Sequence, residues 1–182
     1  MSKKNLTIGL LAVVVFQLLV LAAEYGNAVY PLWTGQEVRL KTVPIDPRSL
    51  FRGNYARLRY EISEIPGADI NKERTPRNGE VIYVGLKAGE DGVCSYSGAS
   101  LERPEDGMYI RGRIQTWRPH RSETYQVEYG IEAFFAPKEK ALKLEKNLRS
   151  QGIAKVMLAR NGKAALKDVV GEEDLQRPAG KG

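Results

Sequence analysis

The sequence predicts a mainly β domain of α+β character, an antiparallel sheet or open barrel with one late helix, preceded by an N-terminal transmembrane helix. Three observations predict this fold class. Residues 6–23 are apolar except for Thr7 and Gln17, most later segments alternate between apolar and polar residues, and turn-forming runs separate these segments. Alternation is typical of strands with one buried face, and an apolar run of about 18 residues is typical of a membrane span.

The apolar run reads LTIGLLAVVVFQLLVLAA from Leu6 to Ala23 and carries no charge. As a helix it covers about 27 Å, close to the roughly 30 Å of a bilayer core. Lys3 and Lys4 precede the run and Glu24 follows it. The positive-inside bias therefore places the N-terminus in the cytoplasm and the rest of the chain outside. We expect a single-pass protein of the cytoplasmic (inner) membrane, held through residues 6–23.

Two other interpretations of this segment remain open. A cleaved signal peptide would use the small residues Gly26-Asn27-Ala28, but the run is longer than the usual apolar region of about 7–15 residues. A buried helix of a soluble protein is less favoured, because the run has no polar face. We favour the anchor, and we expect Tyr25, Tyr30 and Trp33 to lie at the membrane interface.

Eight predicted strands and one predicted helix lie between turn-forming runs. The strands are 37–43, 55–62, 80–87, 92–100, 108–117, 124–135, 153–159 and 163–170. Asp91-Gly92 and Asn161-Gly162 predict tight hairpins. Residues 137–150 instead repeat Leu and Ala at helical spacing behind Pro137, which suits a first helical turn.

These elements define the expected domains. Residues 1–24 form a cytoplasmic tip and anchor, 25–175 an extracytoplasmic β-rich domain, and 176–182 a disordered tail. The net charge of +6 suits an anionic partner, although the expected topology argues against nucleic acid. Outward strand positions are strongly basic: Arg39, Lys41, Arg57, Arg59, Arg111 and Arg113. We favour a solvated face paired with Glu61, Glu128 and Glu132 over a dedicated anion-binding surface.

The residues indicate neither a cofactor nor a metal site. His120 is the sole histidine and Cys94 the sole cysteine, whereas a zinc site needs three or four ligands. The sequence contains neither the ligand spacing of a calcium-binding loop nor the glycine-rich motif of a phosphate-binding loop. Cys94 lies in an alternating stretch, which is typical of a small buried residue. The sequence thus contains no recognisable catalytic set, and we do not expect an enzyme.

The most distinctive segment is PIDPRSLFRGNYARLRY, from Pro44 to Tyr60. Asp46-Pro47 starts a rigid turn, since proline restricts itself and the residue before it. Gly53-Asn54 predicts a second turn, because both residues tolerate positive φ. A loop folded back on itself would let Arg48 or Arg52 pair with the Asp46 carboxylate.

From Gly53 to Tyr60 this segment resembles the signature of the bacterial GDYXXLXY family, and residues 44–52 resemble the approach to that signature. A second block, Tyr129 to Pro137 with Glu145 downstream, resembles a later family pattern. The resemblance implies a membrane-anchored extracytoplasmic protein, of a kind often encoded beside multi-pass membrane proteins, with no established activity. The family's aspartate is Asn54 here, which keeps the turn and loses the charge. This favours a structural role for that position.

Three functions follow as hypotheses. The first is a non-catalytic accessory of an integral membrane protein. The second is a hydrolase similar to type I signal peptidases, which need a serine just before their proline; here Val43 precedes Pro44, and Ser49 lies after it. The third is a binder of anionic lipid head groups or an envelope polymer.

If a site exists, the residues that we expect to form it are Asp46, Arg48, Arg52, Gly53, Asn54, Tyr55 and Glu132. The structural alternative, which we favour, is an ion-pair and turn cluster that fixes the loop.

Overall fold

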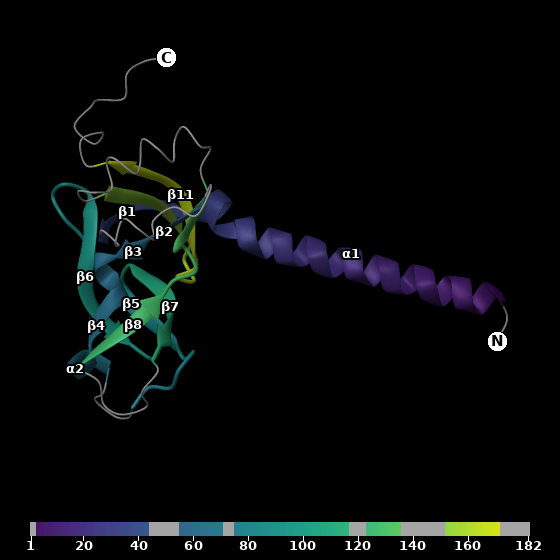
Figure 1. The fold of residues 1–182 in the computed structure, drawn as a ribbon, viewed down its shortest axis with the longest axis horizontal. Helices are drawn as coiled ribbons and strands as arrows, with labels where there is room; N and C mark the ends of the chain where they lie inside the picture. Colours follow the sequence, from purple (N-terminus) through teal and green to yellow (C-terminus); the bar gives the residue numbers. More distant parts are fainter. Residues whose placement is uncertain (1–2, 44–54, 71–74, 117–122, 136–151, 172–182) are drawn as a thin grey trace, which may run out of the picture.

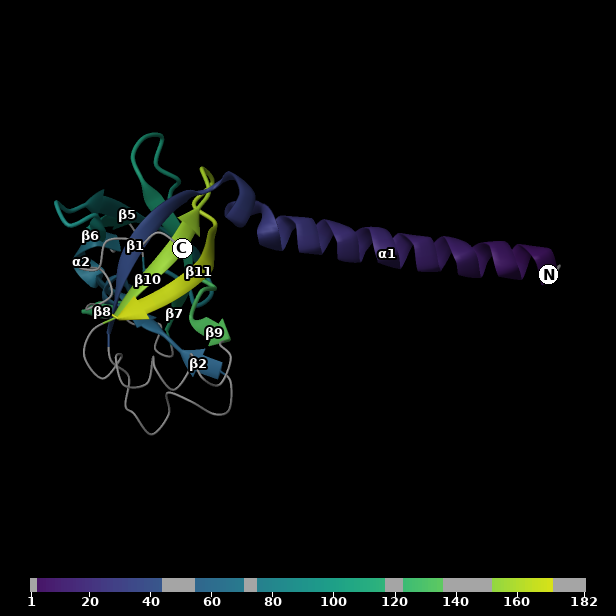
Figure 2. The same cartoon turned by 90° about the horizontal axis from the view of Figure 1, so that it is seen from above.

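The computed structural model describes residues 3–43, 55–70, 75–116, 123–135 and 152–171. It shows a mostly β protein in which a curled mixed sheet forms a half-barrel and a long helix, α1 (Lys3–Thr34), projects from it (Figure 1 and Figure 2). The predicted fold class, a β-rich domain behind an N-terminal apolar helix, is confirmed. The predicted late helix over 137–150 lies outside the described residues.

The described residues form a nine-stranded sheet and a separate two-stranded sheet. The large sheet consists of β1 (Gln36–Val43), β3 (Arg59–Tyr60), β4 (Glu64–Pro66), β5 (Val81–Ala88), β6 (Val93–Ser100), β7 (Tyr109–Gln115), β8 (Thr124–Glu128), β10 (Gly152–Leu158) and β11 (Ala164–Gly171). The small sheet pairs β2 (Tyr55–Arg57) with β9 (Ala133–Phe135). A 3₁₀ turn, η1 (Glu61–Ser63), and a short helix, α2 (Gly67–Ile70), complete the elements.

The large sheet runs β11-β10-β1-β6-β5-β7-β8-β4, with β3 beside the far end of β1. β1 and β6 are parallel, and the other described pairs are antiparallel. The sheet curls so far that the tip of the β10–β11 hairpin returns to β7, where the Arg111 amide donates to the Gly162 carbonyl at 2.8 Å. Two strands that are far apart in the sheet order thus become neighbours at this point.

The concave side of the half-barrel holds the hydrophobic core. Its members alternate with outward polar residues along each strand, as the sequence pattern predicts. Ile110 and Ile114 of β7 are fully buried, whereas Arg111 and Arg113 between them are exposed. The most completely buried large side chains are Leu40, Tyr60, Ile65, Ile82, Val84, Ile110, Ile114, Tyr125, Val156 and Val169. Cys94 is buried in the same cluster, as expected, and burial raises the pKa of its thiol.

Two predicted strands are each divided. The predicted strand 55–62 becomes β2, β3 and η1, and the predicted strand 124–135 becomes β8 and β9. The break after β8 is a turn in which Gly130 has φ +79°. The breaks occur because Leu58 donates its amide to the Glu132 carbonyl at 2.7 Å, so the chain leaves one sheet to pair in the other. The Asp91-Gly92 and Asn161-Gly162 hairpins are confirmed as β5–β6 and β10–β11.

Helix α1 is long and apolar enough to cross a membrane. It contains an 18-residue window of mean hydropathy 2.7 that is entirely unburied, and its large apolar side chains from Leu6 to Leu21 are 44–68% exposed. The helix continues beyond residue 24, where the anchor was expected to end, into the domain. Tyr25 and Trp33 are 68% and 77% exposed near its domain end.

The junction between α1 and the domain is a packed contact. Pro31, in the last turns of α1, is buried and has no amide hydrogen, so the Asn27 carbonyl four residues earlier lacks its helical donor. Lys163 replaces that donor: its Nζ lies 2.6 Å from the Asn27 carbonyl oxygen and 2.9 Å from Asn27 Oδ1. At Gly35, a Cβ would lie only 2.9 Å from the Leu158 amide nitrogen. The β10–β11 hairpin therefore lies along the end of α1.

Candidate functional site

The two blocks that resemble the family pattern meet in space. β2 pairs with β9 in register, so that Ala56 opposes Phe134. Beyond β2, the Leu58 amide donates to the Glu132 carbonyl, and the Tyr60 hydroxyl donates to the Ile131 carbonyl at 2.6 Å. Segments about 70 residues apart in the sequence are thus joined by backbone pairing and by one buried side chain.

Two buried tyrosines pack where these two sequence blocks meet. The rings of Tyr60 and Tyr129 pack edge to face, 6.5 Å apart at 71°. The Tyr129 hydroxyl donates to the Ile62 carbonyl at 2.5 Å. Burial, and secondarily the negative charge of Glu132, raises the pKa of both phenols above the ordinary value. Both tyrosines therefore stay neutral donors, which suits a structural role and not proton transfer at neutral pH.

Glu132 fixes the turn between β8 and β9. Its carboxylate Oε1 accepts from the Tyr129 amide at 2.5 Å across Gly130, and its own carbonyl accepts from Leu58. The side chain is half-buried. The carboxylate contact is local and satisfies a backbone amide of the turn, as a turn-stabilising carboxylate does, whereas the carbonyl contact joins the turn to a distant segment.

Beside this turn the half-barrel leaves an opening, which we call the seam pocket. It has a volume of about 360 Å³ and lies between β7, the β8–β9 turn and the start of β11. The pocket is lined by Val81, Arg111, Gly112, Arg113, Gln115, Glu128, Tyr129, Gly130, Glu132, Lys163 and Ala164. Among the expected site residues that the structure describes, Glu132 lines this pocket.

The charged side chains of the seam pocket differ in whether they already have a partner within the protein. Glu128 lies 3.7 Å from Arg57 and accepts from Gln115 at 2.9 Å. Arg113 donates to the Gly79 carbonyl, and Lys163 is held by Asn27. The exposed Arg111 side chain makes no hydrogen bond or ion pair with another described residue. Arg111 is therefore the cation that is most available to a ligand.

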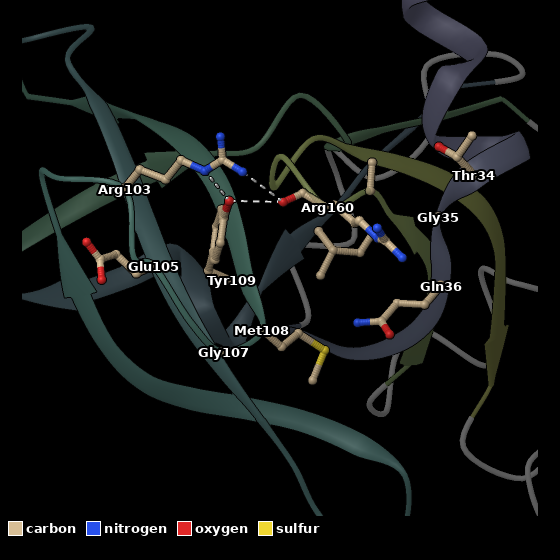
Figure 3. Close-up of a pocket in the computed structure, with 11 residues that line it drawn as sticks. Thr34, Gly35, Gln36, Arg103, Glu105, Gly107, Met108, Tyr109 and Arg160 are labelled. Atoms are coloured by element: carbon tan, nitrogen blue, oxygen red, sulfur yellow. Dashed lines mark hydrogen bonds between the residues drawn. The ribbon is translucent and has the colours of Figure 1, made fainter.

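A second hollow, the helix-end pocket, lies where α1 passes into β1 and has a volume of about 410 Å³. Arg103 reaches across it: its Nε donates to the Tyr109 hydroxyl at 2.7 Å, and that hydroxyl donates to the Arg160 carbonyl at 3.0 Å (Figure 3). Glu105 points away from this cluster (Figure 3). The Arg103 guanidinium also lies 5.9 Å from the Tyr109 ring centroid. The cluster ties the hairpin tip to β7.

Two residues of the predicted basic face, Arg57 and Arg59, have carboxylate partners within the protein. Arg59 contacts Glu64 and donates to Gln126 Oε1 at 2.9 Å, while Arg57 lies near Glu128. The predicted pairing with Glu128 is confirmed, whereas the acceptor for Arg59 is Glu64 and not Glu61. Each of these two arginines therefore has a carboxylate that offsets its charge.

The other expected site residues lie elsewhere. Asp46, Arg48, Arg52, Gly53 and Asn54, with Ser49 of the hydrolase hypothesis, fall outside the described residues; Tyr55 is described only as part of β2. Sequence reasoning missed Asn27 and Lys163. A proline in a helix signals a free carbonyl four residues earlier, but nothing in the sequence identifies the donor that binds it.

These features define a class: a small β half-barrel carried on an apolar helix, with two sequence blocks joined at its core. A family model confirms the particular family. The GDYXXLXY protein model matches residues 17–169, most of the chain, and the chain belongs to this family. No curated protein and no solved structure matches the chain.

Proposed function

We propose that this protein is a single-pass protein of the bacterial cytoplasmic membrane that acts as a non-catalytic accessory of an integral membrane protein. In this proposal residues 6–23 cross the bilayer, the N-terminus is cytoplasmic, and the domain lies on the outer, periplasmic side. The exposed apolar surface of α1 supports the anchor, because only lipid or another apolar helix can cover it. Lys3 and Lys4 support the orientation.

The contact between α1 and the domain also favours an anchor over a cleaved signal peptide. The small residues Gly26-Asn27-Ala28 lie inside α1, and Lys163 binds Asn27. Cleavage after Ala28 would remove that contact and expose the end of a packed helix. The contact between Lys163 and Asn27 therefore supports an anchor that stays attached.

The observation that carries the accessory function is this fixed attachment. A domain on a flexible linker samples many orientations, whereas a domain joined through a continuous helix and a second contact keeps one orientation to the bilayer. Lys163 on Asn27 and Leu158 beside Gly35 supply that second contact. A fixed height and orientation suit a protein that acts on a neighbour in the same membrane.

Crosslinking in native membranes tests the proposal. A photoreactive amino acid placed at Trp33, which is highly exposed beside the junction, is expected to capture an integral membrane protein. The matched control carries the same group at Ser95, which is exposed on β6, on the side of the domain away from α1 (Figure 1 and Figure 2). Equal capture at both positions would indicate random collision and contradict a specific partner.

A second measurement separates the helix from the domain as the interface. The full chain, extracted in mild detergent, is compared with a variant whose residues 6–23 are replaced by a leucine-rich span of equal length. A partner bound through α1 is lost from the variant, while one bound through the domain is kept. A wild-type protein that comes out alone and monomeric contradicts the accessory function.

A further inference from the structure

The seam pocket shares a residue with the contact between the domain and α1. In the view from above, β9 and β11 lie on the side of the domain that faces α1, and β6 lies at the opposite side (Figure 2). Lys163, which lines the pocket, touches α1 at Asn27. The pocket and the domain end of the helix are therefore adjacent.

The rise of the helix places this contact relative to the bilayer. Asn27 lies four residues beyond Ala23, the end of the apolar run, which corresponds to about 6 Å along a helix. The polar head-group layer on each side of a bilayer is about 5–8 Å thick. If residues 6–23 occupy the bilayer core, as proposed above, the Lys163 ammonium lies at the level of the head groups.

The charges in the pocket favour an anion. Arg111 is exposed and has no polar partner among the described residues, while Lys163 and Arg113 add positive charge beside it. The two carboxylates that line the same pocket are already engaged: Glu128 by Arg57 and Gln115, and Glu132 by the Tyr129 amide. An arginine offers the paired donors that suit phosphate oxygens.

We propose that the seam pocket binds the phosphate of an anionic phospholipid in the adjacent leaflet, with Arg111 as its principal ligand. Lys163 keeps the pocket at the head-group level through Asn27 and contributes charge and its remaining N–H. This inference rests on the proposed anchoring of residues 6–23 but not on the accessory function. A bound lipid would add a second attachment point and further restrict the tilt of the domain.

Lipid retention by the full chain tests this site. The protein is purified in uncharged detergent micelles and titrated with phosphatidylglycerol, and bound lipid is counted by native mass spectrometry. Arg111→Gln is expected to weaken binding about tenfold, because it removes a charge-assisted interaction. The matched control is Lys87→Gln, the same charge change at an exposed strand position that pairs with Ser95 of β6. Its binding is expected to change less than twofold.

Further measurements identify the source of the phosphate and the role of the contact between Lys163 and Asn27. Phosphatidylcholine, whose choline cancels the phosphate charge, is expected to bind more weakly. Asn27→Ala, which keeps every cation of the pocket, is expected to retain phosphatidylglycerol binding. Equal loss in the Arg111 and Lys87 variants, or full competition by inorganic phosphate at the lipid concentration, would overturn the proposal. These results do not depend on a protein partner, so they leave the accessory function to its own test.

Discussion

Two neighbouring regions share the segment 125–135: the buried contacts of Tyr60 and Tyr129, which we call the core junction, and the seam pocket, which Tyr129 also lines. Toward the core, Tyr60 and Tyr129 are buried and fully hydrogen-bonded, and they join the two family blocks. Toward the seam, Arg111 is exposed and unpartnered among the described residues. The difference indicates that Leu58 and Tyr60 of the family signature build the fold, while Arg111, an exposed cation of the described residues, lies outside that signature.

Replacing one residue of each region by alanine should give the largest difference in the free energy of unfolding. Tyr60→Ala removes a fully buried ring and should lower the free energy of unfolding by about 3–5 kcal/mol. Arg111→Ala should change it by about 0.5 kcal/mol or less, as exposed positions usually do. Thermal unfolding of the full chain in micelles, followed by near-ultraviolet circular dichroism, measures both. Similar losses in the two variants would contradict the division between structural and binding residues.

Gly112 lies on the boundary between the two regions and sharpens the comparison. A Cβ at this position would lie 2.3 Å from Val127 Cγ1, 2.9 Å from Tyr129 Cδ1 and 3.0 Å from the Glu128 carbonyl oxygen. Gly112→Ala should therefore cost about 1–3 kcal/mol through overpacking. Gly26→Ala is the control: it meets no atom within 4 Å and lies in a helix, so it should be neutral or slightly stabilising.

The buried tyrosines predict a loss of stability at alkaline pH. Burial raises the pKa of Tyr60 and Tyr129 in the folded protein above 10.0, the value of a free phenol. A raised folded pKa means that stability is fully present below pH 10 and falls as the pH rises above it, because the unfolded chain ionises first. Tyrosinate absorbance should thus appear together with unfolding. Tyr129→Phe should make this dependence shallower, whereas ionisation of both phenols before unfolding would be inconsistent with their burial.

A small effect is expected at an exposed ion pair between the edge strand β11 and β1. Lys167 Nζ lies 2.8 Å from Glu37 Oε2, and this hydrogen bond, with the charge of Lys167, lowers the pKa of Glu37. Because the pKa of Glu37 is lower in the folded protein, its ion pair stabilises the fold at pH values above 4.5, the value of the unfolded chain. This stabilisation is lost as the pH falls below that value. Lys167→Gln should cost about 0.2–1 kcal/mol at neutral pH and less in high salt. An effect as large as that of Gly112→Ala would show that the sheet edge is more tightly coupled to the core.

Much of the fold could be predicted because period-two patterns are local. The alternation around Ile110 and the Asn161-Gly162 turn identified β7 and the β10–β11 hairpin close to their observed bounds. The division of the predicted strands 55–62 and 124–135 could not be predicted. It depends on Leu58 pairing with Glu132, a contact between residues far apart in the sequence.

The candidate site could be predicted less well for the same reason. Glu132 is in the seam pocket, but Arg111 reaches it from β7 and Lys163 from the β10–β11 hairpin through the curl of the sheet. Arg111 was expected only as one of several outward cations. The pairing that satisfies Arg57 and Arg59, and thereby distinguishes Arg111, becomes visible only with the strand order.

The central claim is that α1 holds the domain in one orientation with the hairpin tip at the bilayer surface. Spin labels on Asn161→Cys at that tip and on Ser95→Cys of β6, each in a Cys94→Ala background, test it in bilayers containing a nickel-chelating lipid. We expect strong relaxation of the label at position 161 by the head-group nickel and weak relaxation at position 95. Equal relaxation at both positions would contradict a fixed orientation, and stronger relaxation at position 95 would reverse it.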